Sequence, residues 1–323
     1  MEQTPQPSRN SIPDRLNIVV KDGLKAGLKS CIFLLKIIVP VSLAVSLLNF
    51  SGVLPWLAQF LQPMMGLLGL RGEAALVFVS SILLNNYSAI AVIQTLEFTG
   101  REVSIMAVMC LIAHNMIVET AVMKKAGSSV LKMVTLRIGM AITAAFILNL
   151  IMPATIELAY QTTVAAAETS FLPFLLNWLL DTGLLVLKIV IFVFGLMLLQ
   201  RALDEFRITH MLSRFFAPLM RVFGLSKDSS LLWIVINTLG YAYGAAVIMD
   251  QVQGGGMKKQ DADLFNHHAA VSHSLLEDTL LWLAMGVSIL WLVPPRLILA
   301  LVVVWFEKFR RSHFRQSFRA GTL

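Results

Sequence analysis

Charge and cysteine are scarce in this chain. Only 14% of its 323 residues are charged, whereas soluble globular proteins carry about 25%. The two cysteines, Cys31 and Cys110, both fall in apolar runs, so we expect them to be small core residues that indicate no particular redox compartment. The low charge excludes an ordinary soluble globular protein.

Motifs for catalysis and for nucleotide-driven work are also missing. The sequence has no Gly-x4-Gly-Lys-[Ser/Thr] loop, no nucleophile elbow and no zinc-protease motif. His-x3-His and Cys-x2-Cys ligand spacings are absent as well. We therefore expect neither an enzyme nor a bound cofactor or metal, and any driving force must come from ion gradients or from partners.

Long apolar runs dominate what is present. Hydrophobic residues make up 57% of the chain and the mean hydropathy is +0.76. Several runs exceed about 18 residues, which is enough for a helix to cross the hydrocarbon core of a bilayer. The sequence therefore predicts an all-α polytopic membrane protein, with the lipid bilayer as its first partner.

The order of these runs recurs once along the chain, which predicts an internal repeat. When the sequence is aligned with itself at a shift of 155 residues, Pro63 aligns with Pro218 and Gly69 with Gly224. Near the end of each unit the shift that aligns the residues is 159. These later pairs are His114 with His273, Glu119 with Asp278, Thr120 with Thr279, and Arg137 with Arg296. Apolar matches arise by chance, but matches of His, Pro, Gly and Arg in one order rarely do.

The positions of lysine and arginine predict the topology. If each repeat has three full spans plus one re-entrant hairpin, 21 of the 26 basic residues fall on the cytoplasmic side. Both termini are then cytoplasmic, in a bacterial inner membrane. Three spans per repeat also make the second repeat inverted, as in many transporters. The expected parts are an amphipathic segment (1–27), a first repeat (28–152), an external connector (153–182), a second repeat (183–308) and a basic tail (309–323).

Polar residues interrupt the two expected hairpins. Asn85, Asn86, Tyr87 and Ser88 break the first, and Asn237, Tyr241 and Tyr243 with neighbouring glycines break the second. A buried amide without a partner costs a few kcal/mol, and unwound backbone at this depth must line protein or water. We interpret both tips as contacts to a substrate. The alternative is hydrogen bonding between helices.

Ionisable residues gather in two related segments. His114, Asn115 and Glu119 lie in the first, and His273, Ser274, Glu277 and Asp278 lie in the second. Such residues inside a span are costly and indicate function. They could bind a polar substrate, carry a coupling proton or coordinate a divalent metal. The alternative is a structural His–carboxylate network at the repeat interface.

Four further cations are related by the repeat. Lys36 and Lys188 lie within apolar runs, where they could reach the membrane surface through their long stems, pair with Glu119 or Asp278, or attract an anionic substrate. Arg137 and Arg296 are expected near opposite membrane faces, where they could hold lipid headgroups.

Three segments resemble one known family. The tip at 85–88, the Ala-His-Asn-x3-Glu-Thr segment at 113–120 and the Ser-His-Ser-Leu-Leu-Glu-Asp-Thr segment at 272–279 resemble the Gate, or nucleoside recognition, domain family, which includes the spore maturation A and B type membrane proteins. The resemblance implies two Gate units and nucleoside binding. The chain lacks the GTPase domain and the evident cysteine ligands of the related ferrous iron transporter.

Taken together, these features predict a secondary transporter or permease-like protein that binds a small polar solute between two inverted repeats. The resemblance implies that this solute is a nucleoside. One alternative is a non-transporting scaffold or accessory subunit, working as a homodimer or with a partner membrane protein. A second alternative is divalent metal transport. Nucleic acid is not expected as a partner, because the net charge of +7 follows the membrane topology.

Overall fold

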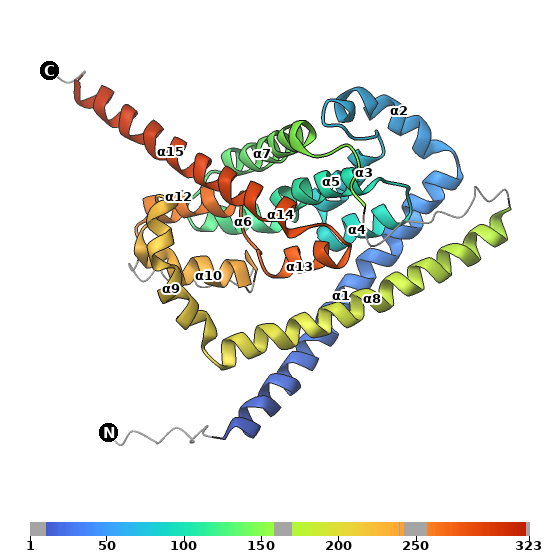
Figure 1. The fold of residues 1–323 in the computed structure, drawn as a ribbon, viewed down its shortest axis with the longest axis horizontal. Coiled ribbons are helices and arrows are strands. Elements are labelled where there is room, and N and C mark those ends of the chain that lie inside the picture. The colour runs from blue at the N-terminus through green and yellow to red at the C-terminus, as the bar shows by residue number, and fades with distance from the viewer. Residues whose placement is uncertain (1–10, 158–169, 239, 242–256, 321–323) are drawn as a thin grey trace.

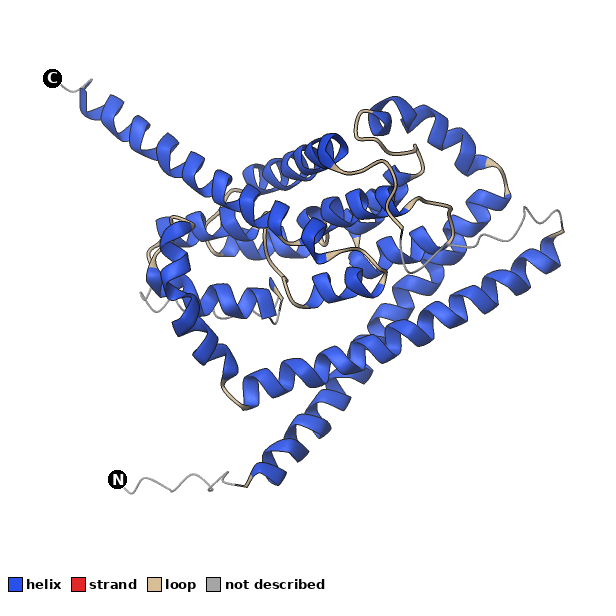
Figure 2. Cartoon of the chain, viewed as in Figure 1, coloured by secondary structure: helices blue, strands red, loops and turns tan. Residues whose placement is uncertain are grey.

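Every regular element in the described part of the chain is a helix (Figure 2). The computed structural model describes residues 11–157, 170–238, 240–241 and 257–320. Five of its helical segments are long and apolar enough to cross a membrane, which agrees with the predicted all-α polytopic membrane protein. They span Ile12–Phe50, Gly100–Lys125, Val130–Ile151, Phe171–Glu205 and Ile289–His313.

Two long helices, α1 (Ile12–Phe50) and α8 (Phe171–Glu205), cross along one side of the molecule (Figure 1). They run antiparallel, since Arg15 near the start of α1 pairs with Glu205 at the end of α8, at 3.1 Å between Nε and Oε1. Gly27 permits the close approach: a Cβ there would lie 2.6 Å from Cδ1 of Phe194. The described part of the expected amphipathic segment and the first span thus form one continuous helix, which is capped by Ser11.

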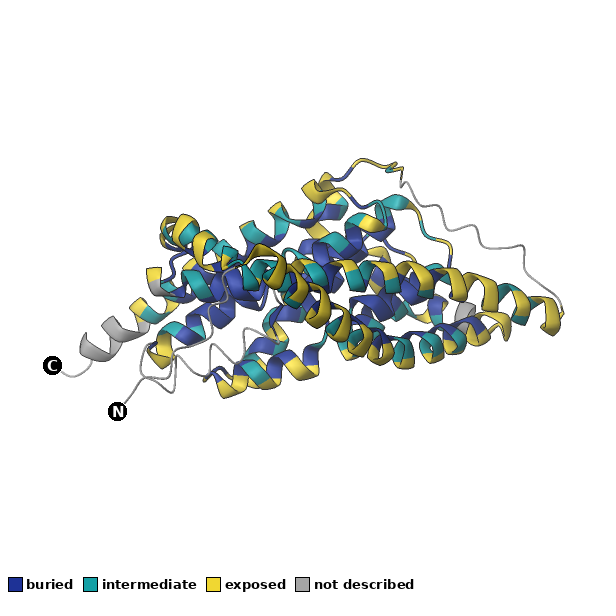
Figure 3. Cartoon of the chain, turned by 90° about the horizontal axis from the view of Figure 1, so that it is seen from below, coloured by how far each residue is buried: buried dark blue, intermediate teal, exposed yellow. Residues whose placement is uncertain are grey.

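The outer faces of α1 and α8 are apolar although they are exposed (Figure 3). Leu16, Leu24 and Leu28 on α1 and Leu176 and Leu184 on α8 all have half or nearly half of their surface accessible. Large exposed apolar areas are rare on soluble monomers. In a membrane protein such a surface faces lipid, so α1 and α8 lie at the periphery.

The centre of the molecule is α5 (Gly100–Ala113), in which every residue from Glu102 to Ala113 is buried. A capping box between Thr99 and Glu102 fixes its first turn. It packs against α7 (Val130–Ile151), and the corresponding α12 (Lys259–Ala269) packs against α15 (Pro294–Ala320). The site described below is built at the inner ends of α5 and α12.

The remaining helices are short, and several are halves of broken helices. Helices α3 and α4 are separated by Leu84 and Asn85, and α5 and α6 by His114 and Asn115. Their bounds, with those of the other short elements, are α2 (Val53–Gly66), α3 (Ala74–Leu83), α4 (Asn86–Gln94), α6 (Met116–Lys125), α9 (Ile208–Val222), η1 (Lys227–Ser229), α10 (Ser230–Thr238), α13 (Glu277–Ala284) and α14 (Ile289–Leu292).

The local geometry of the chain is duplicated where the sequence repeats. Left-handed backbone occurs at four pairs of positions related by 155 or 159 residues: Gly52 with Arg207, Gly69 with Gly224, Asn115 with Ser274, and Gly127 with Gly286. The amide of Asn115 donates to the carbonyl of Ser81, and that of Ser274 donates to the carbonyl of Ile236, both at 3.0 Å. These matches concern backbone rather than composition, and they support two structurally equivalent units.

One expected span has a different form. Residues 264–285, expected as the fifth full span, contain the end of α12, an irregular stretch and α13. The helix is interrupted where Ser274 takes up left-handed backbone and donates its amide to the carbonyl of Ile236 in α10. The corresponding helix of the first unit also breaks, but at His114 and Asn115 alone.

Candidate functional site

Two histidines from the two units meet in the core. His114 ends α5 and His273 follows α12, both have 5% or less of their surface accessible, and their Nε2 atoms lie 3.4 Å apart. Each Nδ1 lies against the carbonyl four residues earlier, Cys110 at 3.0 Å and Ala269 at 2.6 Å. A carbonyl oxygen can only accept, so Nδ1 carries the proton in both rings. Both Nε2 atoms are left to face the interior of the site.

Two carboxylates approach the same Nε2 atoms. Glu119 in α6 places Oε1 at 3.3 Å from Nε2 of His114 and Oε2 at 3.2 Å from Nε2 of His273. Asp278 in α13 places Oδ2 at 3.2 Å from Nε2 of His114. The sequence predicted that these four residues belong together, and the structure joins them into one cluster, the His–acid cluster (His114, Glu119, His273, Asp278).

Two arginines, Arg137 and Arg296, contact the residues of this cluster in the core. The expectation that they lie near the membrane faces is therefore wrong. Arg137 and Arg296 are fully buried. Arg137 donates to the carbonyls of Ile112 and His114, and its Nη2 lies 2.7 Å from Oε2 of Glu119. Arg296 donates to the carbonyl of His273 and to Oγ1 of Thr279. The broken helices explain this placement, because their ends leave carbonyls that need donors.

The first hairpin tip reaches the His–acid cluster. Asn86, Tyr87 and Ser88 are buried at the start of α4, and Asn86 and Tyr87 lie within interaction distance of Asp278. Neither amide atom of Asn86 makes a hydrogen bond of normal geometry, although the residue is only 1% exposed and Asp278 is its polar neighbour. Asn85 has a structural task instead, since its Oδ1 accepts from the Ser88 amide and caps α4.

The second hairpin contributes less than the sequence suggested. The ring of Tyr241 packs edge-on against His273, with centroids 5.7 Å apart, and its hydroxyl donates to Asn266. Asn237 donates to the carbonyl of Trp233 within its own helix, while its Oδ1 has no partner. Tyr243 lies outside the described residues.

Three predicted site residues lie beside the cluster rather than in it. Asn115 and Ser274 occupy the two left-handed positions that turn the chain between half-helices. Glu277 accepts a hydrogen bond from Gln200 of α8 at 3.3 Å and has no ion pair with either histidine of the cluster among the described residues. Gln200 was missed by our sequence analysis, although an amide inside the apolar run 183–203 was a signal for it.

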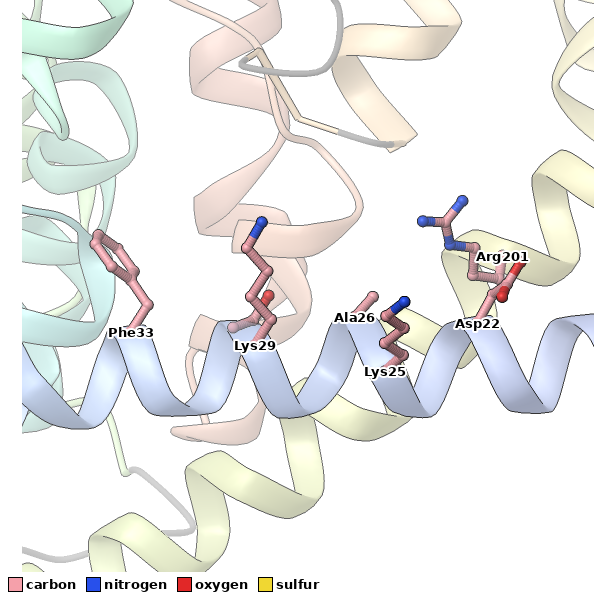
Figure 4. Close-up of a pocket in the computed structure, with 7 residues that line it drawn as sticks. Asp22, Lys25, Ala26, Lys29, Phe33 and Arg201 are labelled. Atoms are coloured by element: carbon pink, nitrogen blue, oxygen red, sulfur yellow. The ribbon is translucent and has the colours of Figure 1, made fainter.

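The lysines of the apolar runs are exposed on α1 and α8, Lys36 and Lys188 alike, so neither is part of the buried cluster. A cavity of about 660 Å³ lies elsewhere between these helices, near the start of α1 and the end of α8 (Figure 4). Its lining includes Lys25, Lys29 and Arg201. This open groove is separate from the His–acid cluster.

Two groups of side chains in the described residues have the composition of a metal site. His114, Glu119 and His273 form one, and Asp263, His267 and Glu307 form the other, with ligand atoms within 4.8 Å of one another in each. They differ in their surroundings. The first faces Asp278 and the amide of Asn86, whereas the second is ringed by basic side chains.

Comparison with known proteins shows the family to which the chain belongs. The family model for the Gate domain, described as nucleoside recognition, matches residues 31–130. An uncharacterized membrane protein of Bacillus subtilis (strain 168), YvoD, is 36% identical over 270 residues, which cover 83% of this chain and 86% of the relative. The chain belongs to the Gate family of membrane proteins. No solved structure matches it.

The Gate match covers one half of the cluster only. Residues 31–130 include the tip with Asn86, together with His114 and Glu119. His273 and Asp278 lie beyond the match, in the unit that repeats the same backbone geometry. The cluster therefore joins the matched Gate unit to a second unit that the structure, rather than the family model, brings to it.

Proposed function

We propose that this Gate-family protein is a permease-like transporter of the bacterial inner membrane that binds a small polar solute between two inverted repeats. One observation carries the proposal: the amide of Asn86 is buried beside Asp278, where the broken helices of both units meet, and neither of its atoms makes a hydrogen bond of normal geometry. An unsatisfied buried amide costs about 1–3 kcal/mol. A solute with a donor and an acceptor would satisfy both of its atoms.

The antiparallel packing of α1 and α8 supports the inverted arrangement. These helices begin the two units, and they cross in opposite directions with Arg15 against Glu205. Broken helices that meet near the middle of the membrane are typical of transporters with inverted repeats. In this arrangement both termini are cytoplasmic, and the protein carries solute without a catalytic step.

The solute class follows from the site and from the family description together. The cluster offers carboxylate, imidazole and amide groups, and Tyr87 and Tyr241 add flat ring faces next to it. Such a mixture suits a polar ring compound that can stack and form hydrogen bonds. We infer a nucleoside or nucleobase as the first class to test.

A ligand-stabilisation screen of the detergent-purified protein tests this proposal. Nucleosides, nucleobases and small organic acids are added, and free ligand at 100 times its Kd should stabilise the fold by about 2.7 kcal/mol. Asn86→Ala should abolish any hit. Asn49→Ala, which removes an exposed amide near the end of α1, is the matched control and should retain it. A hit that survives Asn86→Ala would contradict the proposed site.

A non-transporting scaffold is the second candidate, and one observation favours it. Tyr241, Asn266 and Ser128 satisfy one another through bonds of 2.8 and 2.9 Å, as interface residues of a structural network would. A scaffold predicts no ligand hit, together with a large loss of stability in Asn266→Ala. Co-purification of the wild type with itself or with another membrane protein would then identify its partner.

A further inference from the structure

The inward-facing atoms of the His–acid cluster are hydrogen-bond acceptors whenever its two rings are neutral. Nδ1 of His114 and of His273 donates to a backbone carbonyl, so each neutral ring presents the lone pair of Nε2 to the interior. The oxygens of Glu119 and Asp278 around them accept only, and of these Oε2 of Glu119 also meets the donor Arg137. Acceptors that converge at 3.2–3.4 Å repel one another unless they share a cation, either a proton on a ring nitrogen or a metal ion.

We propose that His114, His273 and Glu119 bind one divalent transition-metal cation, with an open coordination position on the side of Asp278. The donor set is two imidazole nitrogens and one carboxylate, held in the core by helices from both units. The same set with a fourth, open position is known from metal sites that bind a further ligand. The proposal names a ligand of the site described above and does not depend on transport.

The distances fit a tetrahedral cation better than they fit hydrogen bonds. Ligand bonds of 2.0–2.2 Å to a tetrahedral metal place the ligand atoms about 3.3–3.6 Å apart. The two Nε2 atoms lie 3.4 Å apart, and Oε1 of Glu119 lies 3.3 Å from Nε2 of His114, so Oε1 is the ligand oxygen. The other oxygen, Oε2, lies 3.2 Å from Nε2 of His273 and pairs with Arg137. Charge-assisted hydrogen bonds are shorter, about 2.7–2.9 Å.

The surroundings hold the ligands in place. The carbonyls of Cys110 and Ala269 fix the orientation of the two imidazoles, and Arg137 fixes Glu119 from behind. Metal-binding histidines nearly always donate their other ring nitrogen in this way. The two imidazole contacts are related by the repeat, so the duplicated backbone builds the two halves of one site.

The second group of candidate ligands provides a contrast. The carboxylate of Glu307 is already within 2.8 Å of Nζ of Lys132, Nη2 of Arg310 and Nε of Arg311. Three basic groups at this carboxylate repel an incoming cation. His267 and its neighbours are therefore an ion-pair network, and His267 serves as a matched control for the proposed site.

The donor set and the local charge limit what can bind. Nitrogen donors favour zinc, cobalt or ferrous iron over magnesium and calcium, which prefer oxygen ligands. Arg137 pairs with Glu119, and the buried Arg296 lies within electrostatic range of Asp278 without forming an ion pair, so two positive charges already stand against these two acids. A bound dication therefore leaves excess positive charge, and an anionic ligand at the open position would reduce it. A solute bearing a carboxylate or phosphate fits this position.

Metal titration of the full-length protein in detergent tests the inference. After chelator treatment, the wild type should bind one Co²⁺ per chain with the visible absorption bands of a tetrahedral complex, and Zn²⁺ should displace it. His114→Gln and His273→Gln should each weaken binding by about 100-fold or more. His267→Gln should bind as the wild type does, and magnesium should not compete.

X-ray absorption of the Zn²⁺-loaded wild type keeps the test independent of variant folding. Two imidazole ligands per metal are expected, and one or none would overturn the inference, as would the absence of stoichiometric binding by the wild type. Metal binding without any solute hit contradicts the proposed function alone. A solute hit lost in Asn86→Ala, in a protein that binds no metal, contradicts this inference alone.

Discussion

The two units share the same backbone geometry, but the acid at the equivalent position is a glutamate in the first unit and an aspartate in the second. The two side chains differ in length by one methylene group. Glu119 and Asp278 occupy equivalent positions, four residues after left-handed Asn115 and Ser274. The longer Glu119 contacts both histidines, whereas Asp278 contacts His114 only. A duplicated frame therefore carries an asymmetric site.

The largest expected difference is the side of the membrane on which equivalent positions of the two units are exposed. Glu97 precedes α5 and Lys258 precedes α12, and both are exposed. In an inverted repeat, Glu97→Cys should react only with reagent added outside, and Lys258→Cys only with reagent added to the cytoplasmic side. Cys31 and Cys110 are buried, so the background should be low. Labelling of both positions from one side would refute the inverted topology.

The next largest difference is expected in the stability lost when each of the buried arginines, Arg137 and Arg296, is replaced. Arg137→Met leaves Glu119 without its cation in the core, and breaking such a pair costs about 3–5 kcal/mol. Arg296→Met removes a cation that forms no ion pair, and it leaves the carbonyls of Leu292 and His273 and the Thr279 hydroxyl without their donor, at about 1–3 kcal/mol. Thermal unfolding of both variants in one detergent measures the difference. Equal losses would mean that the Glu119 ion pair contributes nothing beyond its hydrogen bonds.

Replacing a glycine by alanine should change stability in opposite directions in α1 and in α8. In Gly27→Ala the new Cβ would lie 2.6 Å from the Phe194 ring, so α1 and α8 must separate, at about 1–3 kcal/mol. Gly195 of α8 has nothing within 4 Å of the same atom. Gly195→Ala should stabilise its helix by up to about 1 kcal/mol. Melting temperatures that move in the same direction would contradict this packing.

Local chemistry made part of this site predictable from sequence. His114 with His273 and Glu119 with Asp278 were paired because polar residues in apolar runs are conspicuous and the repeat gave their partners. Gln200 belongs to a contact between helices about 77 residues apart, which no spacing rule reveals. The arginines were misplaced because charge counting treats each arginine as a membrane-face residue, whereas Arg137 and Arg296 serve helix breaks whose positions depend on tertiary structure.

The fold shows the same division. Hydropathy and length were enough for α1, α7, α8 and α15, because an apolar helix is the cheapest way to cross a bilayer. The segment 264–285 also has a helical pattern, yet it breaks near Ser274, whose amide bonds to Ile236 of α10. That bond joins residues far apart in the chain. A window of local sequence does not contain the information that fixes such a break.

The smallest expected effect tests the asymmetry itself. Glu119→Asp shortens the acid that reaches both histidines, and should destabilise the protein by about 1–2 kcal/mol through weakened contacts to His273 and Arg137. Asp278→Glu lengthens the acid that reaches only His114, and it keeps the charge, so the change should stay within about 1 kcal/mol. In the Glu119→Asp, Asp278→Glu double variant, the longer acid comes from the second unit.

A double-mutant cycle then compares the two single variants with the double variant. If acid length alone sets the asymmetry, the double variant should recover part of the stability lost in Glu119→Asp. Strictly additive losses would instead mean that Arg137, which has its acid partner only in the first unit, makes the two halves different.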